Sequence, residues 1–260
     1  MRVNGREVLD PARWILPQRD RVVVDRRLVG DDAARVVIAF HKPKGCVTTR
    51  VDPGGRSTVY DVLGEVGRPA PDSAGSFPGW VFPVGRLDRD TSGLLVMTND
   101  HRLGQRLTDP EHRVPKTYHA RVRGVPDREA LRALREGLPL DGGVVTRPAR
   151  VRVLGIPSGT TSSTWLEIVL SEGKNRQVRR MGAAVGHEVL DLVRVRIGRL
   201  PLGDLAPGEW RELGPEEVAL LAGDEAREAT GRAGRSAYDG LPPSRVPPPA
   251  GRRGNSRRSR

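Results

Sequence analysis

The chain has 260 residues, a formal net charge of +12 and a single cysteine, Cys46. This length is sufficient for one large domain or two small ones, and a single cysteine excludes an internal disulfide, as is typical of the reducing cytoplasm. No apolar run reaches the roughly 18–20 residues of a membrane span, and the N-terminus lacks the apolar centre of a signal peptide. We therefore expect a soluble, cytoplasmic protein whose partner is polyanionic: RNA, DNA or an anionic membrane surface.

Much of the positive charge lies at the C-terminus, where residues 231–260 hold eight arginines and one acidic residue. Residues 224–260 show no apolar periodicity, so we expect a disordered basic tail that adds salt-sensitive, nonspecific affinity. Because the tail accounts for so much of the charge, a folded nucleic-acid site has to be sought in local clusters of basic residues.

Short strands and turns are expected over residues 1–30, which have too little apolar surface to fold alone. Apolar or alternating runs then predict strands at 36–40, 94–98, 116–124, 149–155, 164–170 and 189–198. Helical spacing, caps and stops predict helices at 101–109, 127–137, 174–186 and 214–223. Residues 64–83 are predicted to form a loop. Many strands with scattered helices favour an α+β fold with a central mixed, largely antiparallel sheet.

The stretch "VGRLDRDTSGLL", residues 84–95, surrounds one carboxylate with cations. Asp88 follows Arg86 by two residues and leads through a Thr-Ser-Gly turn into a buried strand, so it should lie at the lip of the sheet. A cation within about 4–6 Å would keep Asp88 ionised, as a nucleophile requires. The alternative is an exposed ion pair worth at most about 1 kcal/mol.

A second cluster, "EGKNRQVRRM", contains four cations within seven residues at a predicted helix start. The first helical turn offers free backbone N–H groups and the positive end of the helix dipole. Lys174 and Arg176 add charge there, and Arg176 shares a helix face with Arg179. The partners of this cluster are either phosphates or a carboxylate inside the protein; the alternative is a solvated basic helix face.

Residues 116–124 alternate between polar and apolar side chains, which predicts a half-buried strand with Tyr118 on its inward face. Tyr118 is either a core tyrosine or a flat ring that stacks on a planar substrate and uses its hydroxyl as an acid or base. Lys42 and Lys44, on either side of Pro43, either hold RNA phosphates or are solvated. The five histidines are dispersed and no Cys–Cys pair exists, so we predict no metal site; no phosphate-binding or dinucleotide-binding glycine motif indicates a cofactor.

Three motifs in this order and spacing, "GRLDRDTSGLL", "KTYHARVRG" and "EGKNRQVRRMGAAVG", resemble the bacterial ribosomal RNA pseudouridine synthases, in the branch of the small-subunit enzyme and its single-target large-subunit relatives. "HKPKGCVTT" and "LVRVRIG…LAPGEWREL" match the flanking pattern, and the resemblance covers about residues 36–214. It implies two half-domains with an RNA cleft between them. It also implies conversion of uridine to pseudouridine without cofactor or metal.

The resemblance also implies the site. Asp88 takes the position of the catalytic aspartate, Tyr118 that of the tyrosine stacked on the target base, and Arg179 that of the basic residue paired with the aspartate. Arg86 is associated with the flipped-out nucleotide. The ionised aspartate either attacks the sugar or removes a proton from it. We predict that the residues contacting the RNA are Arg86, Lys42, Lys44, Lys116, Lys174, Asn175 and Arg176.

The expected domains are a truncated alpha-L RNA-binding module at 1–32, a catalytic domain at 33–223 and the basic tail at 224–260. The module would lack its helical first half. The region from "TTSSTWLEIVL" to "GEWREL" is most similar to large-subunit members, so we expect a large-subunit ribosomal RNA or pre-ribosomal particle as partner and a protein that acts as a monomer. The alternative is a non-catalytic RNA-binding or ribosome-assembly factor, although the presence of all three site residues favours the enzyme.

Overall fold

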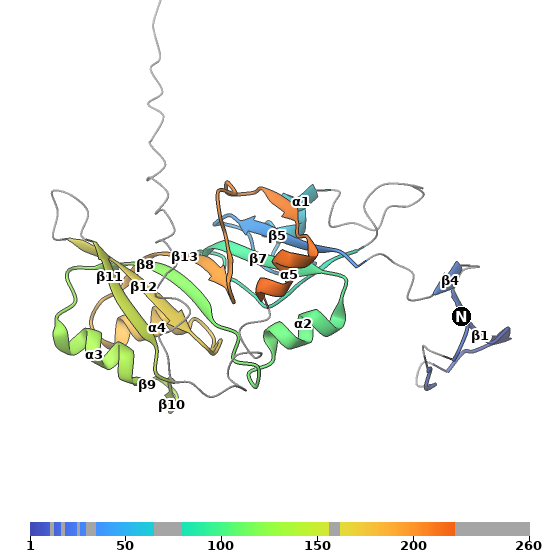
Figure 1. The fold of residues 1–260 in the computed structure, drawn as a ribbon, viewed down its shortest axis with the longest axis horizontal. Helices are drawn as coiled ribbons and strands as arrows, with labels where there is room; N and C mark the ends of the chain where they lie inside the picture. Colours follow the sequence, from blue (N-terminus) through green and yellow to red (C-terminus); the bar gives the residue numbers. More distant parts are fainter. Residues whose placement is uncertain are drawn as a thin grey trace, which may run out of the picture.

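The computed structural model describes residues 1–10, 13–16, 19–24, 27–29, 35–64, 80–155 and 162–221. Its main sheet is built from β5 (Val37–Lys42), β6 (Phe82–Pro83), β7 (Ser92–Thr98), β8 (Lys116–Arg123), β11 (Arg150–Gly155), β12 (Ser163–Leu170), β13 (Val189–Ile197), β14 (Leu200–Pro201) and β15 (Trp210–Glu212). The order is β11-β12-β8-β13-β7-β5-β15, with β14 beside β13 and β6 beside β7 (Figure 1).

Among the pairs of described strands in this sheet, β7 and β13 run parallel and the others run antiparallel. The close approach of β7 to β13 depends on Gly93, which has a φ of +112° and whose added Cβ would lie 2.3 Å from the Arg194 carbonyl oxygen. The predicted α+β fold with a mixed, largely antiparallel sheet is confirmed.

Two of the predicted helices begin at side-chain caps. The described helices are α1 (Val59–Leu63), α2 (His101–Thr108), α3 (Arg128–Glu136), α4 (Gln177–Ala184) and α5 (Pro215–Leu221). Asp100 and Asp127 accept backbone N–H bonds at the starts of α2 and α3, as N-cap carboxylates do. The short α1, capped reciprocally by Thr58 and Asp61, is an element that the apolar periodicity did not predict. None of the described helices is long and apolar enough to cross a membrane.

The core divides into clusters on the two halves of the sheet. One half packs on both faces: Leu94 and Val96 belong to a cluster on one face of β7, and Leu95 and Met97 to a cluster on the other. In the other half, β8, β11 and β12 bury one face against α3 and α4, which lie beneath them in Figure 1. The small strands β9 (Pro139–Leu140) and β10 (Val144–Val145) pair with each other.

The prediction that strand 116–124 is half buried is wrong in its first part. Thr117 and His119 are 2 % and 1 % exposed, although they alternate with the inward-facing Tyr118 and Ala120. β8 lies in the interior of the sheet, between β12 and β13, where the side chains of both neighbouring strands flank its own.

The N-terminal residues form a separate four-stranded sheet of β1 (Arg2–Val3), β2 (Arg6–Glu7), β3 (Val22–Val24) and β4 (Arg27–Val29), in the order β2-β1-β3-β4. Its core is limited to Val3, Val8 and Val22, with Ile15 packed against them. The short strands expected there are present. The interpretation of this region as part of an RNA-binding module stays a prediction, and the predicted tail and most of the 64–83 loop lie outside the described residues.

Candidate functional site

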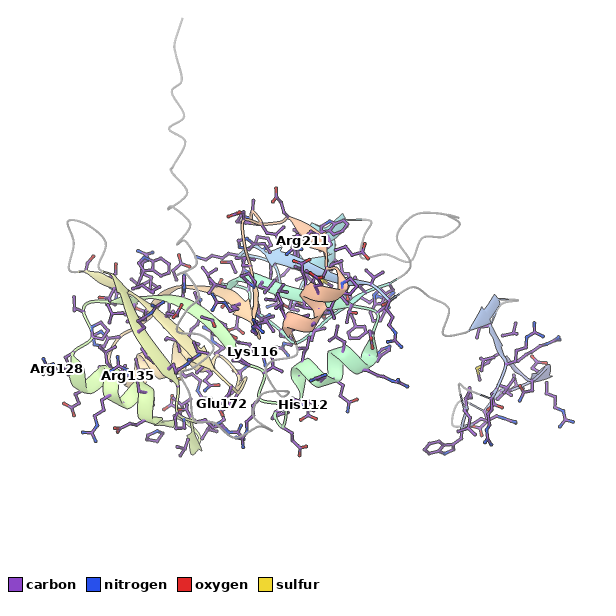
Figure 2. The ribbon with its side chains drawn as sticks, viewed as in Figure 1. His112, Lys116, Arg128, Arg135, Glu172 and Arg211 are labelled. Carbon is purple, nitrogen blue, oxygen red and sulfur yellow. The ribbon has the colours of Figure 1, made fainter. Side chains whose placement is uncertain are left out.

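A pocket of about 430 Å³ opens between the two halves of the main sheet. Loop 84–91 and the end of α2 form one wall, and β8 with loop 171–176 and the start of α4 forms the other. Figure 2 shows Lys116 near the middle of the main body, where the halves meet. The residues that sequence analysis singled out and that line this pocket are Asp88, Tyr118, Arg86, Lys116, Lys174, Asn175 and Arg176.

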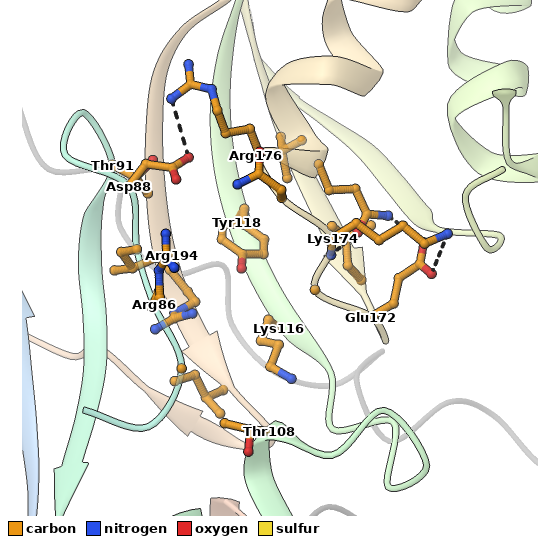
Figure 3. A pocket seen from close by; sticks show the side chains of 18 of the residues that line it. Arg86, Asp88, Thr91, Thr108, Lys116, Tyr118, Glu172, Lys174, Arg176 and Arg194 are labelled. Atoms are coloured by element: carbon orange, nitrogen blue, oxygen red, sulfur yellow. Dashed lines mark hydrogen bonds and ion pairs between the residues drawn. The ribbon is translucent and has the colours of Figure 1, made fainter. Parts of the chain in front are cut away.

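The Asp88 carboxylate is paired across the pocket. Its Oδ2 lies 3.7 Å from Nη1 of Arg176, and its side chain is 27 % exposed (Figure 3). Because a solvent-accessible ion pair at this distance contributes at most about 1 kcal/mol, the pair orients the carboxylate more than it stabilises the fold. Asp88 therefore remains open to a ligand that enters the pocket.

The predicted pairing of Asp88 with Arg179 is wrong in this structure. Arg179 donates from Nη1 to the Val189 carbonyl at 2.9 Å and from Nη2 to the Asp90 carbonyl at 2.9 Å, and it does not line the pocket. Since α4 begins at Gln177 rather than near Lys174, Arg176 precedes the helix and reaches toward Asp88. Arg179, a turn further on, instead ties α4 to the loop that carries Asp88.

Lys42 is the largest departure from the predicted RNA contacts. Its side chain is 0 % exposed. Its Nζ donates to the carbonyl oxygens of Pro43 and Thr91, each at 2.9 Å, and to that of Arg89 at 3.5 Å. Burial lowers the pKa of Lys42. The prediction of a phosphate contact is wrong, because Lys42 fixes the backbone of the loop that presents Asp88.

Lys44 is exposed, but it lies outside the pocket lining. Its Nζ is 2.6 Å from Oδ1 of Asp191 on β13. This ion pair joins the loop after β5 to the sheet, so a phosphate contact by Lys44 would have to compete with Asp191. The role predicted for Lys44 stays a prediction.

A buried carboxylate organises the opposite wall. Glu172 is 9 % exposed. Its Oε1 accepts from the Arg147 backbone N–H at 2.9 Å and from Gln177 Nε2 at 2.6 Å, and its Oε2 lies 3.1 Å from Lys174 Nζ. Burial disfavours the charge of Glu172, but these hydrogen bonds outweigh it and leave the pKa of Glu172 below its usual range.

The same network determines where α4 starts. Gln177 accepts a hydrogen bond from the Lys174 backbone N–H at 3.1 Å, and Arg176 adopts a left-handed conformation with φ +47°. Such a conformation is costly for a residue other than glycine and concentrates at functional sites. Lys174 is not the mobile cation that its sequence suggested, because it is paired with Glu172 and also donates to the Val145 carbonyl.

Tyr118 lies between two core clusters and also lines the pocket. In Figure 3 its ring stands below the Asp88–Arg176 pair, with Arg86 and Arg194 to one side and Lys116 beneath. Both sequence interpretations therefore apply: the ring packs in the core at one edge and is open to the pocket at the other.

Arg194 is a pocket residue that the sequence analysis did not select. The available signal was the presence of charged residues, Asp191, Arg194 and Arg196, within the largely apolar strand "VLDLVRVRIG". Arginine is rarely buried unless it is paired, so its presence there indicated a special environment. Among the described residues, no group of three His, Cys, Asp or Glu side chains is arranged to hold a metal ion.

Comparison with known proteins identifies the family. The RNA pseudouridylate synthase family model matches residues 36–184. The chain is 40 % identical over 190 residues to ribosomal large subunit pseudouridine synthase E of Vibrio parahaemolyticus, covering 69 % of this chain and 74 % of that protein. It is 39 % identical over 186 residues to ribosomal large subunit pseudouridine synthase B of Bacillus subtilis, covering 72 % and 71 %.

A crystal structure of a pseudouridylate synthase has the same fold. It superposes with a TM-score of 0.62 at 29 % identity, covering 85 % of this chain and 87 % of that one. The expected fold and the resemblance drawn from the three motifs are both confirmed. With more than half of its length matched by the family model, the chain belongs to the RNA pseudouridylate synthase family.

Proposed function

We propose that this protein, as an RNA-modifying isomerase, converts a uridine of large-subunit ribosomal RNA into pseudouridine, with Asp88 as the group that acts on the ribose. The observation that carries the assignment is the place of the Asp88 carboxylate, in a pocket that also holds the Tyr118 ring and the Arg86 and Arg176 guanidinium groups. The relatives named for ribosomal large-subunit substrates support the choice of RNA.

The reaction makes specific demands on this pocket. A uridine within folded RNA must be turned out of its stack, which costs a few kcal/mol. Arg86 and Arg176 are exposed cations at the pocket, placed to offset that cost by contacts with phosphates. The Tyr118 ring offers a flat surface for the extruded base. We propose that the chain acts as a monomer in the cytoplasm.

The chemistry at Asp88 has two forms. The carboxylate either attacks C1′ of the ribose or removes a proton from the sugar; in both forms the bond from C1′ to N1 of the base breaks, the base turns and C5 bonds to C1′. In the first form the bond from the Asp88 oxygen to C1′ breaks as C5 bonds to C1′, and in the second the proton is returned to the sugar. In both forms C5 loses a proton and N1 gains one. Atoms and oxidation state are conserved in this isomerisation, so the reaction itself calls for no redox cofactor. An ionised aspartate serves either form.

The test is a pseudouridine map of ribosomal RNA from a deletion strain complemented with wild type, Asp88→Asn or Asp90→Asn. We expect one or a few large-subunit sites to disappear on deletion, to return with wild type and Asp90→Asn, and to stay absent with Asp88→Asn. Asp90 is a matched control, because it lies two residues away and does not line the pocket.

Two outcomes would contradict the proposal. An unchanged map in the deletion strain would favour a non-catalytic RNA-binding or assembly factor. Full activity of Asp88→Asn would remove Asp88 from the chemistry.

A further inference from the structure

Arg194 on β13 carries an unsatisfied donor into the pocket. The residue is 3 % exposed and lines the pocket wall. Its Nε donates to the Leu94 carbonyl at 2.7 Å, whereas its buried Nη2 has no hydrogen-bond partner among the described residues. A buried donor without a partner costs about 1–3 kcal/mol, and more when it is charged. A buried donor that carries such a cost is typically one whose acceptor is supplied by a bound ligand.

The sheet places Arg194 beside the ring of Tyr118. The two residues are direct partners in the antiparallel pairing of β13 with β8, and both line the pocket. Lys116 lies two residues before Tyr118 and therefore on the same face of β8. Tyr118 is thus accompanied by a guanidinium group across the sheet and by an ammonium group along its own strand.

The three carboxylates that line the pocket have partners other than Arg194 and Lys116. Asp88 pairs with Arg176, Glu172 with Lys174, and Asp109 accepts a hydrogen bond from the Glu111 backbone N–H. Burial, followed by the positive charge of Arg194, lowers the pKa of Lys116 to about 8. Burial is the larger cause, but the second cause shows that Lys116 and Arg194 repel each other, so an anion bound beside both would be stabilised.

We propose that Arg194, assisted by Lys116, binds the carbonyl edge of the target uracil and stabilises the negative charge on the base while it is detached from the sugar. This inference rests on the proposed function. When the C1′–N1 bond breaks, its electron pair stays on the base and spreads over N1, O2 and O4. A new bond from C5 to C1′ then uses an electron pair of the base, and the proton on C5 is lost. Fixed donors aimed at such a charge stabilise it without reorganisation.

The first experiment separates base stabilisation from RNA binding. Arg194→Lys and Lys116→Gln are compared with Arg196→Gln, a matched control, since Arg196 is a buried arginine on the same strand that does not line the pocket. We expect the single-turnover rate at saturating RNA to fall about 10²–10³-fold in Arg194→Lys and less in Lys116→Gln. The RNA Kd should stay within about threefold in both, and Arg196→Gln should keep its rate.

The second experiment varies the leaving group. Fluorine at C5 withdraws electrons, so a detached 5-fluorouracil anion needs less help from the protein. With RNA that carries 5-fluorouridine at the target, we expect the defect of Arg194→Lys and Lys116→Gln in cleaving the C1′–N1 bond to shrink at least several-fold relative to uridine. Thermal melting monitors folding, and if Arg194→Lys does not fold, the Lys116→Gln comparison decides.

Two results would overturn the inference. One is a weaker Kd with a lower salt dependence at an unchanged rate, which would assign these cations to a phosphate. The other is an equal defect with uridine and 5-fluorouridine. A failure of the proposed function is distinct from both, because the wild-type protein would then form no pseudouridine in the RNA.

Discussion

The two walls of the pocket are held in place by buried side chains of opposite charge. Loop 84–91, which presents the Asp88 carboxylate, is held from inside by the buried ammonium group of Lys42. Loop 171–176, which presents the Arg176 guanidinium group, is held from inside by the buried carboxylate of Glu172. In each wall a buried charge fixes the backbone, and a side chain of the opposite charge faces the pocket.

The two internal charges are satisfied to different degrees. Glu172 accepts two hydrogen bonds at Oε1 and has an ammonium partner at Oε2, and its pKa is lowered despite burial. Within the described part of the chain, Lys42 donates its hydrogen bonds to backbone carbonyls alone, and burial lowers its pKa. We infer that the Asp88 wall is held at a higher energetic cost, and that the Arg176 wall is the more stable of the two.

Removal of the cation behind the Asp88 wall should have the largest effect. Lys42→Met keeps the volume of the side chain but leaves buried carbonyl oxygens, including that of Thr91, without a donor. We expect a loss of about 3 kcal/mol in the free energy of unfolding, measured by urea denaturation. Lys44→Met, in the same loop but exposed, should cost less than about 1 kcal/mol. Similar losses in the two variants would contradict the structural role of Lys42.

Replacement of Glu172, behind the Arg176 wall, should have the second largest effect on stability. Glu172→Ala leaves the Arg147 N–H and the Gln177 amide without their acceptor, and we expect a loss of about 2 kcal/mol. Glu172→Gln retains an acceptor oxygen and should lose about half as much. Urea denaturation of the two variants measures the difference. A loss in Glu172→Ala that exceeds that of Lys42→Met would contradict the expected ranking of the two variants.

Sequence patterns predicted the elements of both walls better than the contacts between them. Strand alternation, N-caps and three motifs were enough to predict the fold, the family and seven of the residues that line the pocket. They did not reveal that Lys42 points inward, because a Lys-Pro-Lys turn is compatible with either direction of each side chain. Burial on both faces of β8 likewise depends on its neighbours in the sheet, which local periodicity does not encode.

The pairing of Asp88 was missed for a local reason. The sequence predicted that α4 begins near Lys174 or Asn175, and the family resemblance assigned Arg179 as the partner of Asp88. The left-handed backbone of Arg176 and the Gln177 side chain move the start to Gln177. A single residue outside the usual helical region therefore decides which arginine meets the carboxylate.

The left-handed conformation of Arg176 leads to a prediction of smaller effect, in which stability and RNA affinity respond differently. Arg176→Gly removes a cation from the pocket and also relieves the left-handed strain, which costs about 1 kcal/mol for other residues. We expect the Tm to stay equal or rise slightly, while the RNA affinity falls. Arg176→Ala loses the same cation and keeps the strain, so it should be about 1 kcal/mol less stable than Arg176→Gly. Equal stability of the two variants would show that the strain is absent in solution.

The last expected effect is a pH dependence of stability at Lys116, on the floor between the walls. Its pKa is about 8 in the folded protein and about 10.4 in an unfolded chain. Between these values the unfolded state binds more protons, so this residue makes the free energy of unfolding rise with pH. The destabilisation that Lys116 causes relative to Lys116→Gln is therefore greatest below pH 8 and fades toward pH 10.

Urea denaturation of wild type and Lys116→Gln from pH 7 to 10 measures this difference, and comparison of the two cancels the other groups that titrate in the same range. The Arg194→Gln variant provides a second comparison in this experiment. Because the positive charge of Arg194 helps to lower the pKa of Lys116, its removal should raise that pKa and move the window to higher pH. A difference between wild type and Lys116→Gln that does not vary with pH would mean that the floor of the pocket is fully hydrated and that the two cations do not repel each other there.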